Sequence, residues 1–119
     1  MEASLKFEGP EAGRNLYERE YVVDKPEVTF GRASDNDIQV PTAPIFSDVS
    51  RRHCSFYSEN CGLLFRDYSS KGTLINGESA LPGVVTHLNP GDELTFGNHL
   101  RARVVIKQGL LSKLKSFFS

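Results

Sequence analysis

Residues 53–77, HCSFYSENCGLLFRDYSSKGTLING, decide the fold of this chain. Apolar and polar residues alternate over 53–57 and again over 63–68, and this period of two predicts strands. A turn joins the two segments, and a third short strand follows at 73–75. The Asn76-Gly77 pair after it is a strong signal for a hairpin turn.

The same pattern continues on both sides of this stretch. Short alternating segments are separated by turn residues roughly every ten positions, and no helical period lies between them. This organisation predicts an all-β fold in which two antiparallel sheets pack as a sandwich. Outside 53–77, we predict strands at 16–23, 28–30, 38–40, 84–88, 93–96 and 100–106, with a further alternating pair at Leu5 and Phe7.

Two segments depart from this pattern. Residues 41–47 carry two prolines, and we expect their Ile45-Phe46 pair to be exposed on an extended surface loop. We divide the whole chain into a β-sandwich at 1–107 and an amphipathic segment at 108–119, the second departure from the pattern. In this segment a short helix is predicted, because one helix face would carry Leu110, Leu111, Leu114, Phe117 and Phe118.

The C-terminal segment has two readings. In the first, its helix packs on the sandwich or leads to a neighbouring domain of a larger assembly. In the second, it contacts a membrane surface or a partner groove, since Lys113 and Lys115 lie away from the apolar face.

The bulk composition limits what the chain can do. Its 119 residues make one ordinary domain, and 39% hydrophobic with 24% charged residues is typical of a globular protein. The net charge of −1 argues against bulk nucleic-acid binding, which needs a basic surface. We see no signal peptide, and no apolar run approaches the roughly 20 residues that cross a bilayer. Cys54 and Cys61 lack metal-ligand spacing, so we expect reduced thiols in a cytoplasmic protein, or a nuclear one in a eukaryote.

Three loop segments offer phosphate-binding chemistry, and their order carries a family resemblance. Gly31-Arg32 ends a predicted strand, Ser50-Arg51-Arg52-His53 enters another, and Ser69-Ser70-Lys71-Gly72-Thr73 precedes the Asn76-Gly77 hairpin. Together they resemble the forkhead-associated (FHA) domain family, whose pattern is Gly-Arg, Ser-x-x-His, Ser-x-Asn-Gly-Thr and Asn-Gly. The resemblance covers 7–106, including a turn at 35–38. It implies a sandwich of about eleven strands that binds phosphothreonine peptides through loops at one end.

The resemblance also implies which residues bind the phosphopeptide. Arg32 matches the family arginine that contacts the phosphate, a role that suits the rigid fork of a guanidinium. Ser50 matches a serine whose hydroxyl and backbone amide reach the phosphate, and its position before a strand leaves that amide free for an anion. Arg51 matches the next position, and Ser70 supplies a further hydroxyl. Lys71 stands where the family has asparagine.

Lys71 is therefore a departure from the family pattern. An asparagine side chain can pair with both an N–H and a C=O of the peptide backbone, whereas lysine has three donors and no acceptor. We expect Lys71 to reach the phosphate or an acidic side chain instead, so that charge carries more of the binding.

A second group of residues is implied to support the site without binding the ligand. His53 matches a histidine that the family uses for architecture, because it forms hydrogen bonds across loops. Gly72 and Thr73 shape their turn, Gly31 precedes the phosphate-binding arginine, and Asn76 fits a turn because asparagine tolerates positive φ.

Two other classes of protein, an enzyme and a phosphate-independent scaffold, are alternatives to a phosphopeptide-binding module. An enzyme is disfavoured: Asp48, Ser50 and His53 lie too close along the chain to form a triad, and there is no nucleotide-binding loop or metal cluster. A phosphate-independent scaffold stays open, with a sheet face, residues 41–48 or the C-terminal segment as its surface. We favour a non-enzymatic signalling module that binds a phosphothreonine protein or peptide written by a Ser/Thr kinase. No cofactor, metal or nucleic acid is implied.

Overall fold

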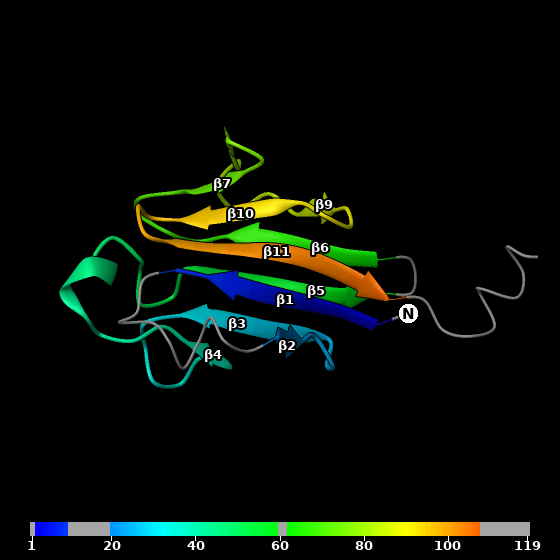
Figure 1. Cartoon of the computed structure of the whole chain (residues 1–119), viewed down its shortest axis with the longest axis horizontal. Helices are drawn as coiled ribbons and strands as arrows, with labels where there is room; N and C mark the ends of the chain where they lie inside the picture. Colours follow the sequence, from blue (N-terminus) through cyan, green and yellow to red (C-terminus); the bar gives the residue numbers. More distant parts are fainter. Residues whose placement is uncertain (1, 10–19, 60–61, 108–119) are drawn as a thin grey trace, which may run out of the picture.

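The computed structural model describes residues 2–9, 20–59 and 62–107, which form two sheets packed face to face (Figure 1). One sheet has the order β2-β1-β11-β10-β7-β8, and the other has the order β4-β3-β5-β6-β9. The predicted all-β sandwich of about eleven strands is therefore confirmed. The strands are β1 (Glu2–Glu8), β2 (Glu20–Val22), β3 (Glu27–Gly31), β4 (Ile38–Gln39), β5 (Cys54–Glu59), β6 (Gly62–Asp67), β7 (Thr73–Ile75), β8 (Glu78–Ser79), β9 (Thr86–Leu88), β10 (Glu93–Phe96) and β11 (Leu100–Lys107).

The strand pairing differs from the prediction in one respect. All pairs are antiparallel except β3 and β4, which run parallel with Phe30 opposite Ile38. The Asn76-Gly77 turn joins β7 to β8 as predicted, and Asn76 has a φ of 52°. The C-terminal segment 108–119 and residues 16–19 of the predicted strand 16–23 lie outside the described residues.

Aromatic side chains fill the space between the sheets. Phe7 on β1, Phe30 on β3 and Phe96 on β10 come from both sheets, and none is more than 1% exposed. The rings of Phe7 and Phe30 stack at 5.6 Å, and those of Phe30 and Phe96 lie 4.4 Å apart. The His53 ring packs edge-to-face with both Phe30 and Phe96. Because His53 belongs to one of the phosphate-binding motifs, these contacts join the apolar core to the loops that carry the motifs.

The loop at 41–47 corrects a prediction. It contains a short 3-10 helix, η2 (Pro44–Phe46), and Phe46 is fully buried in the core while Ile45 is partly buried. The expected exposure of the Ile45-Phe46 pair is therefore wrong. Exposure was inferred from the two prolines and the break in the strand pattern, but the 3-10 turn places Phe46 in the core, where burial of its ring stabilises the loop by about 2 kcal/mol.

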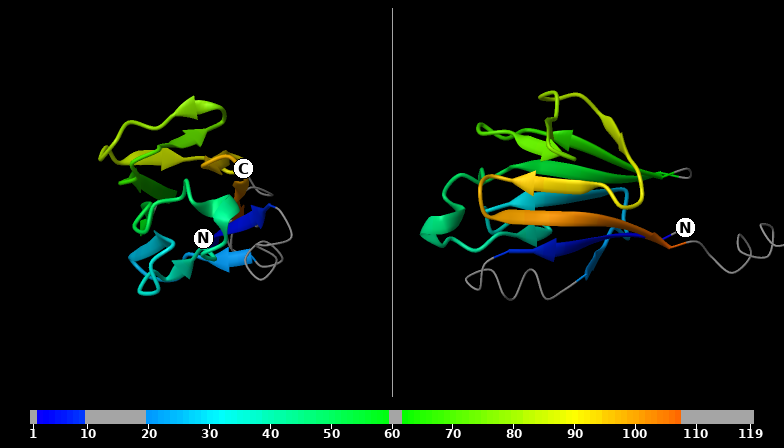
Figure 2. Two further views of the ribbon diagram at one scale, coloured as in Figure 1. Left: turned by 90° about the vertical axis from the view of Figure 1, so that its left-hand side faces the viewer. Right: turned by 45° about the horizontal axis from the view of Figure 1, so that its top comes forward.

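The loops that carry the motifs gather at one end of the sandwich. β3 ends at Gly31, β5 begins at Cys54, and β6 and β7 are joined by residues 68–72; all of these points lie at the left-hand end in Figure 1. Figure 2 (left) looks onto this end and shows the loops side by side. Segments that are distant along the chain thus meet above His53.

Cys54 lies on β5 as a buried free thiol, and burial raises the pKa of this thiol well above its ordinary value. It therefore packs as a small neutral hydrophobe, as expected. Cys61 lies outside the described residues. Within the described ranges, no helix is long and apolar enough to cross a membrane.

Candidate functional site

The backbone of a neighbouring loop fixes the position of Arg32, which follows directly after β3. Its N–H donates to the carbonyl oxygen of Ser50 at 3.1 Å. A β-carbon on Gly31 would lie 2.2 Å from the carbonyl oxygen of Arg51, so only glycine permits this close approach. The Nε–H of Arg32 donates to the carbonyl oxygen of Val49. The guanidinium is thus held through Nε, and its two Nη groups remain for another acceptor.

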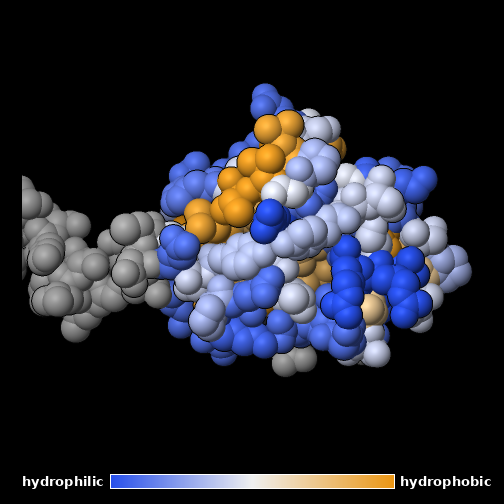
Figure 3. Space-filling model, turned by 180° about the vertical axis from the view of Figure 1, so that it is seen from behind, coloured by the Kyte–Doolittle hydropathy of each residue, from blue (hydrophilic) through white to orange (hydrophobic). Residues whose placement is uncertain are grey.

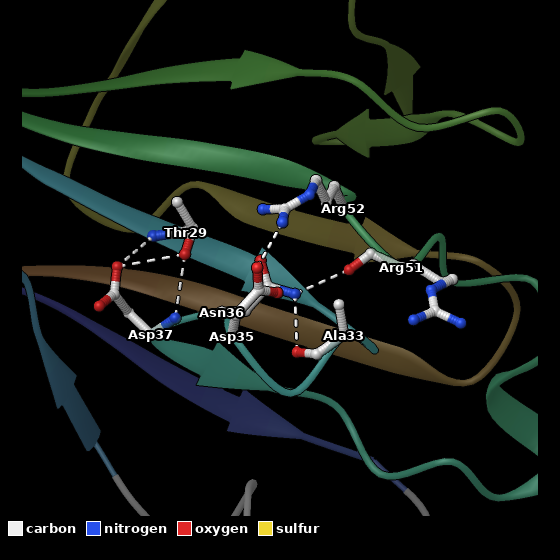
Figure 4. A network of polar contacts seen from close by, with 7 residues as sticks. All are labelled: Thr29, Ala33, Asp35, Asn36, Asp37, Arg51 and Arg52. Carbon is white, nitrogen blue, oxygen red and sulfur yellow. Dashed lines mark hydrogen bonds and ion pairs between the residues drawn. The ribbon is translucent and has the colours of Figure 1, made fainter.

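Asn36 also forms hydrogen bonds to the loop that contains Arg51 (Figure 4). Its Nδ2 group donates to the carbonyl oxygens of Ala33 and Arg51 at 3.0 and 2.7 Å. Figure 4 also shows that Arg52 turns toward Asp35, with which it forms an ion pair, while the Arg51 side chain points the opposite way. Arg51 is exposed and forms no ion pair within the described residues, so its charge is free for a ligand.

Ser50 and Ser70 bring the second and third loops together. The hydroxyl of Ser50 accepts the backbone N–H of Ser70 at 3.0 Å, and the two hydroxyl oxygens are 3.3 Å apart. Ser50 is partly buried and Ser70 is exposed. The carbonyl oxygen that accepts from Arg32 belongs to Val49, the residue before Ser50. The guanidinium of Arg32 therefore lies beside the loop that carries the Ser50 hydroxyl.

The backbone amide of Ser50 corrects a second prediction. We expected this N–H to be free for an anion, but it donates to Nδ1 of His53 at 3.0 Å. His53 is fully buried, and burial lowers the pKa of its imidazole although the nearby charge of Asp67 opposes the shift. Because Nδ1 accepts a hydrogen bond, the proton of the neutral ring must be on Nε2.

The other side of His53 leads into a buried network. Nε2–H donates to Oγ1 of Thr73 at 2.8 Å, and the Thr73 hydroxyl donates to Oδ1 of Asp67 at 3.0 Å. The Ser69 hydroxyl donates to the same carboxylate at 2.8 and 3.1 Å, and it accepts the N–H of Gly72 at 2.8 Å. Thr73 and Asp67 are each only 1% exposed, so a chain of buried hydrogen bonds links this loop to Ser50.

Two of these linking residues were missed by sequence reasoning. Asp67 and Ser69 were treated as parts of a turn, yet Asp67 is the final acceptor of the network. An aspartate that accepts from a residue two positions later is a known turn signal, and Ser69 N–H does contact Oδ1 of Asp67 at 3.3 Å. The DYSS order could therefore have revealed the local turn, but not the link to His53.

Lys71 lies next to Ser70, whereas Asn76 lies away from the Ser50–Ser70 pair. Lys71 follows Ser70, is exposed, and forms no ion pair within the described residues. Asn76 lies at the far end of β7, where its side chain accepts the N–H of Glu93 at 3.0 Å and donates to Asp92 at 2.9 Å. The structure thus brings together Arg32, Ser50, Arg51, Ser70 and Lys71, with Gly31, His53, Gly72 and Thr73 around them, but not Asn76.

The geometry offers anion-binding donors and does not pair Ser50 with His53 as nucleophile and base. His53 faces the backbone N–H of Ser50, not its hydroxyl, so the ring cannot take a proton from that hydroxyl in this arrangement. Among the described residues, no cluster of three or more His, Cys, Asp or Glu side chains could hold a metal ion.

Comparisons with known proteins agree with this arrangement. The family model of the FHA domain matches residues 28–97. A search of curated proteins gave no match. Among solved structures, this chain superposes with a TM-score of 0.75 on a domain from a study of phosphothreonine-dependent FHA domain interactions. The two are 22% identical, and the match covers 92% of this chain and 100% of that one.

Two further structures carry phosphopeptides. EmbR of Mycobacterium tuberculosis, in complex with a low-affinity phosphopeptide, has a TM-score of 0.71 and 25% identity, and the match covers 91% of this chain and 25% of that protein. The N-terminal FHA domain of Rad53p from S. cerevisiae, in complex with a phosphothreonine peptide, has a TM-score of 0.67 and 20% identity, covering 98% and 99% of the two chains. The fold, the order of the motifs and the family match lead to one conclusion: the chain belongs to the FHA domain family.

Proposed function

We propose that this chain is a phosphothreonine-peptide binding module with no catalytic activity, acting in phosphorylation-dependent protein–protein interaction. One observation carries the proposal: Arg32 is held to the carbonyl oxygen of Val49, the residue before Ser50, and the Ser50 hydroxyl lies 3.3 Å from that of Ser70. A phosphothreonine brings about −1.5 to −2 charges and three acceptor oxygens. Arg32 and Arg51 supply matching positive charge locally, and Lys71 adds a further positive charge beside them, although the net charge of the chain is −1.

The complexes of related domains with phosphopeptides support the same function. A Ser/Thr kinase would write the mark, which places the module in the cytoplasm, or in the nucleus of a eukaryote. The buried free thiol of Cys54 suits such a reducing compartment. The sandwich at 1–107 would be the binding unit, and 108–119 a separate segment that could join it to a larger assembly.

Titration with degenerate peptide libraries tests the proposal. We expect binding to a phosphothreonine library and none to its unphosphorylated twin, with a phosphoserine library as a third arm. Arg32→Ala should weaken binding roughly ten- to a hundredfold, because hydrogen bonds to a charged group are worth about 1.5–3 kcal/mol. Arg52→Ala is the matched control, since Arg52 is exposed, pairs with Asp35 and points away from Arg51. Equal affinity of the two variants would remove the main argument.

A phosphate-independent scaffold keeps one supporting observation. The loop between β8 and β9 exposes Leu81, Val84 and Val85, which are 66%, 49% and 49% accessible. Figure 3 shows an apolar stripe on the reverse face of the molecule. Exposed apolar surface of this kind is typical of interaction sites. Partner binding that survives phosphatase treatment and Arg32→Ala, but is lost in Leu81→Asp, would favour the scaffold.

A further inference from the structure

A polar groove begins beside the proposed phosphate site and leads away from it. It has a volume of about 350 Å³ and starts at Lys71, the residue after Ser70. A peptide held at Ser50 and Ser70 would therefore run past this groove. Its walls come from the loops at 48 and 71–73, from β7–β8 and from the β10–β11 turn, and consist of Asp48, Lys71, Gly72, Thr73, Leu74, Ser79, Thr95, Gly97 and Asn98.

Lys71 provides the one positive charge among the described residues that line this groove. Its ammonium forms no ion pair within the described residues, whereas the lysines at 25 and 107 are each paired with a carboxylate. The one acidic wall residue, Asp48, turns its carboxylate toward the β10–β11 turn, where its Oδ2 accepts the N–H of Asn98 at 2.8 Å. Its Oδ1 is buried without a hydrogen-bond partner in the described part of the chain, and a β-carbon on Gly97 would lie 2.4 Å from it.

We infer that Lys71 selects an acidic side chain close to the phosphothreonine of the bound peptide; this inference rests on the proposed function. Arg32 and Arg51 already match the charge of one phosphate group, and the bond from Nε of Arg32 to the carbonyl oxygen of Val49 leaves its Nη groups for that phosphate. The charge of Lys71 is then left for a second anion. A lysine ammonium suits this role because it is a point charge on a flexible stem and needs no fixed geometry. Ser79, Thr95 and Asn98 add hydroxyl and amide groups that can complete the hydration or hydrogen bonding of a carboxylate.

The expected preference is modest because Lys71 is exposed. An exposed ion pair corresponds to about a two- to fivefold gain in affinity, and salt screens it. The preference should therefore appear at one peptide position, at low ionic strength, and shrink at high ionic strength. Arg32 is partly buried, so a phosphate contact there should be less sensitive to salt than the contact of the exposed Lys71.

The experiment scans a phosphothreonine peptide with alanine flanks. Glutamate and then lysine replace each flanking alanine in turn, and affinities are measured with the full chain by fluorescence anisotropy. We expect glutamate at one position to raise affinity about two- to fivefold, Lys71→Met to abolish that gain, and Lys71→Glu to transfer it to the lysine peptide. Lys107→Met is the matched control, because Lys107 ends β11 at the opposite end of the sandwich (Figure 1).

The outcomes separate this inference from the proposed function. If the alanine-flanked phosphopeptide binds but no flanking glutamate helps, or if the gain persists in Lys71→Met, the inference is overturned while the proposed function stands. If no phosphothreonine peptide binds, the proposed function itself fails. A loss of the gain in Lys107→Met as well would show a general charge effect and also overturn the inference.

Discussion

Replacing Thr73 by valine should break the link between the two halves of the candidate site. Thr73 is 1% exposed, and its hydroxyl accepts from Nε2 of His53 at 2.8 Å and donates to Asp67 at 3.0 Å. Valine has nearly the same shape but cannot form either bond. The packing therefore changes little, and the effect reports the hydrogen bonds.

The magnitude follows from which groups lose a partner. The buried Nε2–H of His53 loses the Thr73 oxygen as its acceptor and keeps only the backbone of Gly72 nearby, a loss that costs about 1–3 kcal/mol. Asp67 loses one donor but keeps the hydroxyl and N–H of Ser69, so its share is smaller. We expect Thr73→Val to lower the free energy of unfolding by about 2 kcal/mol, which corresponds to a fall in Tm of roughly 10 °C for a domain of this size.

Two variants serve as controls in a urea denaturation series. Thr73→Ser keeps a hydroxyl at the same place and should recover most of the lost stability. Ser4→Ala removes a hydroxyl that is fully buried on β1 and has no hydrogen-bond partner within the described residues, so it should cost little. The ¹⁵N shifts of the His53 imidazole complete the test. They should show the Nε2–H form in both the wild type and Thr73→Val, because the N–H of Ser50 still donates to Nδ1.

A cost of Thr73→Val no greater than that of Ser4→Ala would refute this role of the Thr73 hydroxyl. An Nδ1–H form of His53 in the wild type would also refute it, since Nδ1 must accept the N–H of Ser50 in this network. An equal loss in Thr73→Ser and Thr73→Val would mean that removing the methyl group costs as much as removing the hydroxyl, and the loss could not be assigned to the hydrogen bonds.

Further predictions concern the same end of the molecule. His53→Ala should lower Tm by more than Arg32→Ala does, because His53 is fully buried and bonded on both sides; differential scanning calorimetry showing the reverse order would mean that their roles are exchanged. The unfolded chain binds a proton on His53 near pH 6.5 while the buried ring, with its lowered pKa, does not. Stability should therefore be complete above that pH and fall as the pH drops below it, by up to about 1.4 kcal/mol per pH unit. Urea midpoints across this range should lose the dependence in His53→Asn and keep it when exposed His99 is changed to Gln. Gly31→Ala should cost about 3 kcal/mol, because its β-carbon would meet the Arg51 carbonyl oxygen at 2.2 Å; a cost below 1 kcal/mol by denaturation would show that the loop yields.

The fold was predictable because its signals are local. Alternation over 53–57 and 63–68 and the turn at Asn76-Gly77 each depend on neighbouring residues, and each appears as a strand or hairpin. The burial of Phe46 was not predictable in this way. It depends on a 3-10 turn after Pro44 and on a pocket in the core, neither of which leaves a periodic pattern.

The contacts between the candidate site residues were only partly predictable. The motif order placed Arg32, Ser50 and Ser70 together, and the structure brings their loops into contact. The role of Asp67 was not visible, because it reaches His53, fourteen residues earlier, only through Thr73, six residues later, and this link forms only in the folded state. A motif names the side chains at a site, whereas the direction of each hydrogen bond depends on the groups beneath it.

The direction of the hydrogen bonds around His53 is set by Asp67, and it determines which donors remain for an anion. A carboxylate only accepts, so Thr73 must donate to it and accept from Nε2 of His53, which leaves Nδ1 to accept the N–H of Ser50. The amides of Arg32, Ser70 and Gly72 likewise donate to acceptors within the chain. Many phosphate sites use free backbone amides, but here those four donors are already engaged. Under the proposed function, phosphate would therefore be bound mainly by side chains, and single substitutions of those side chains can dissect the binding without disturbing the backbone.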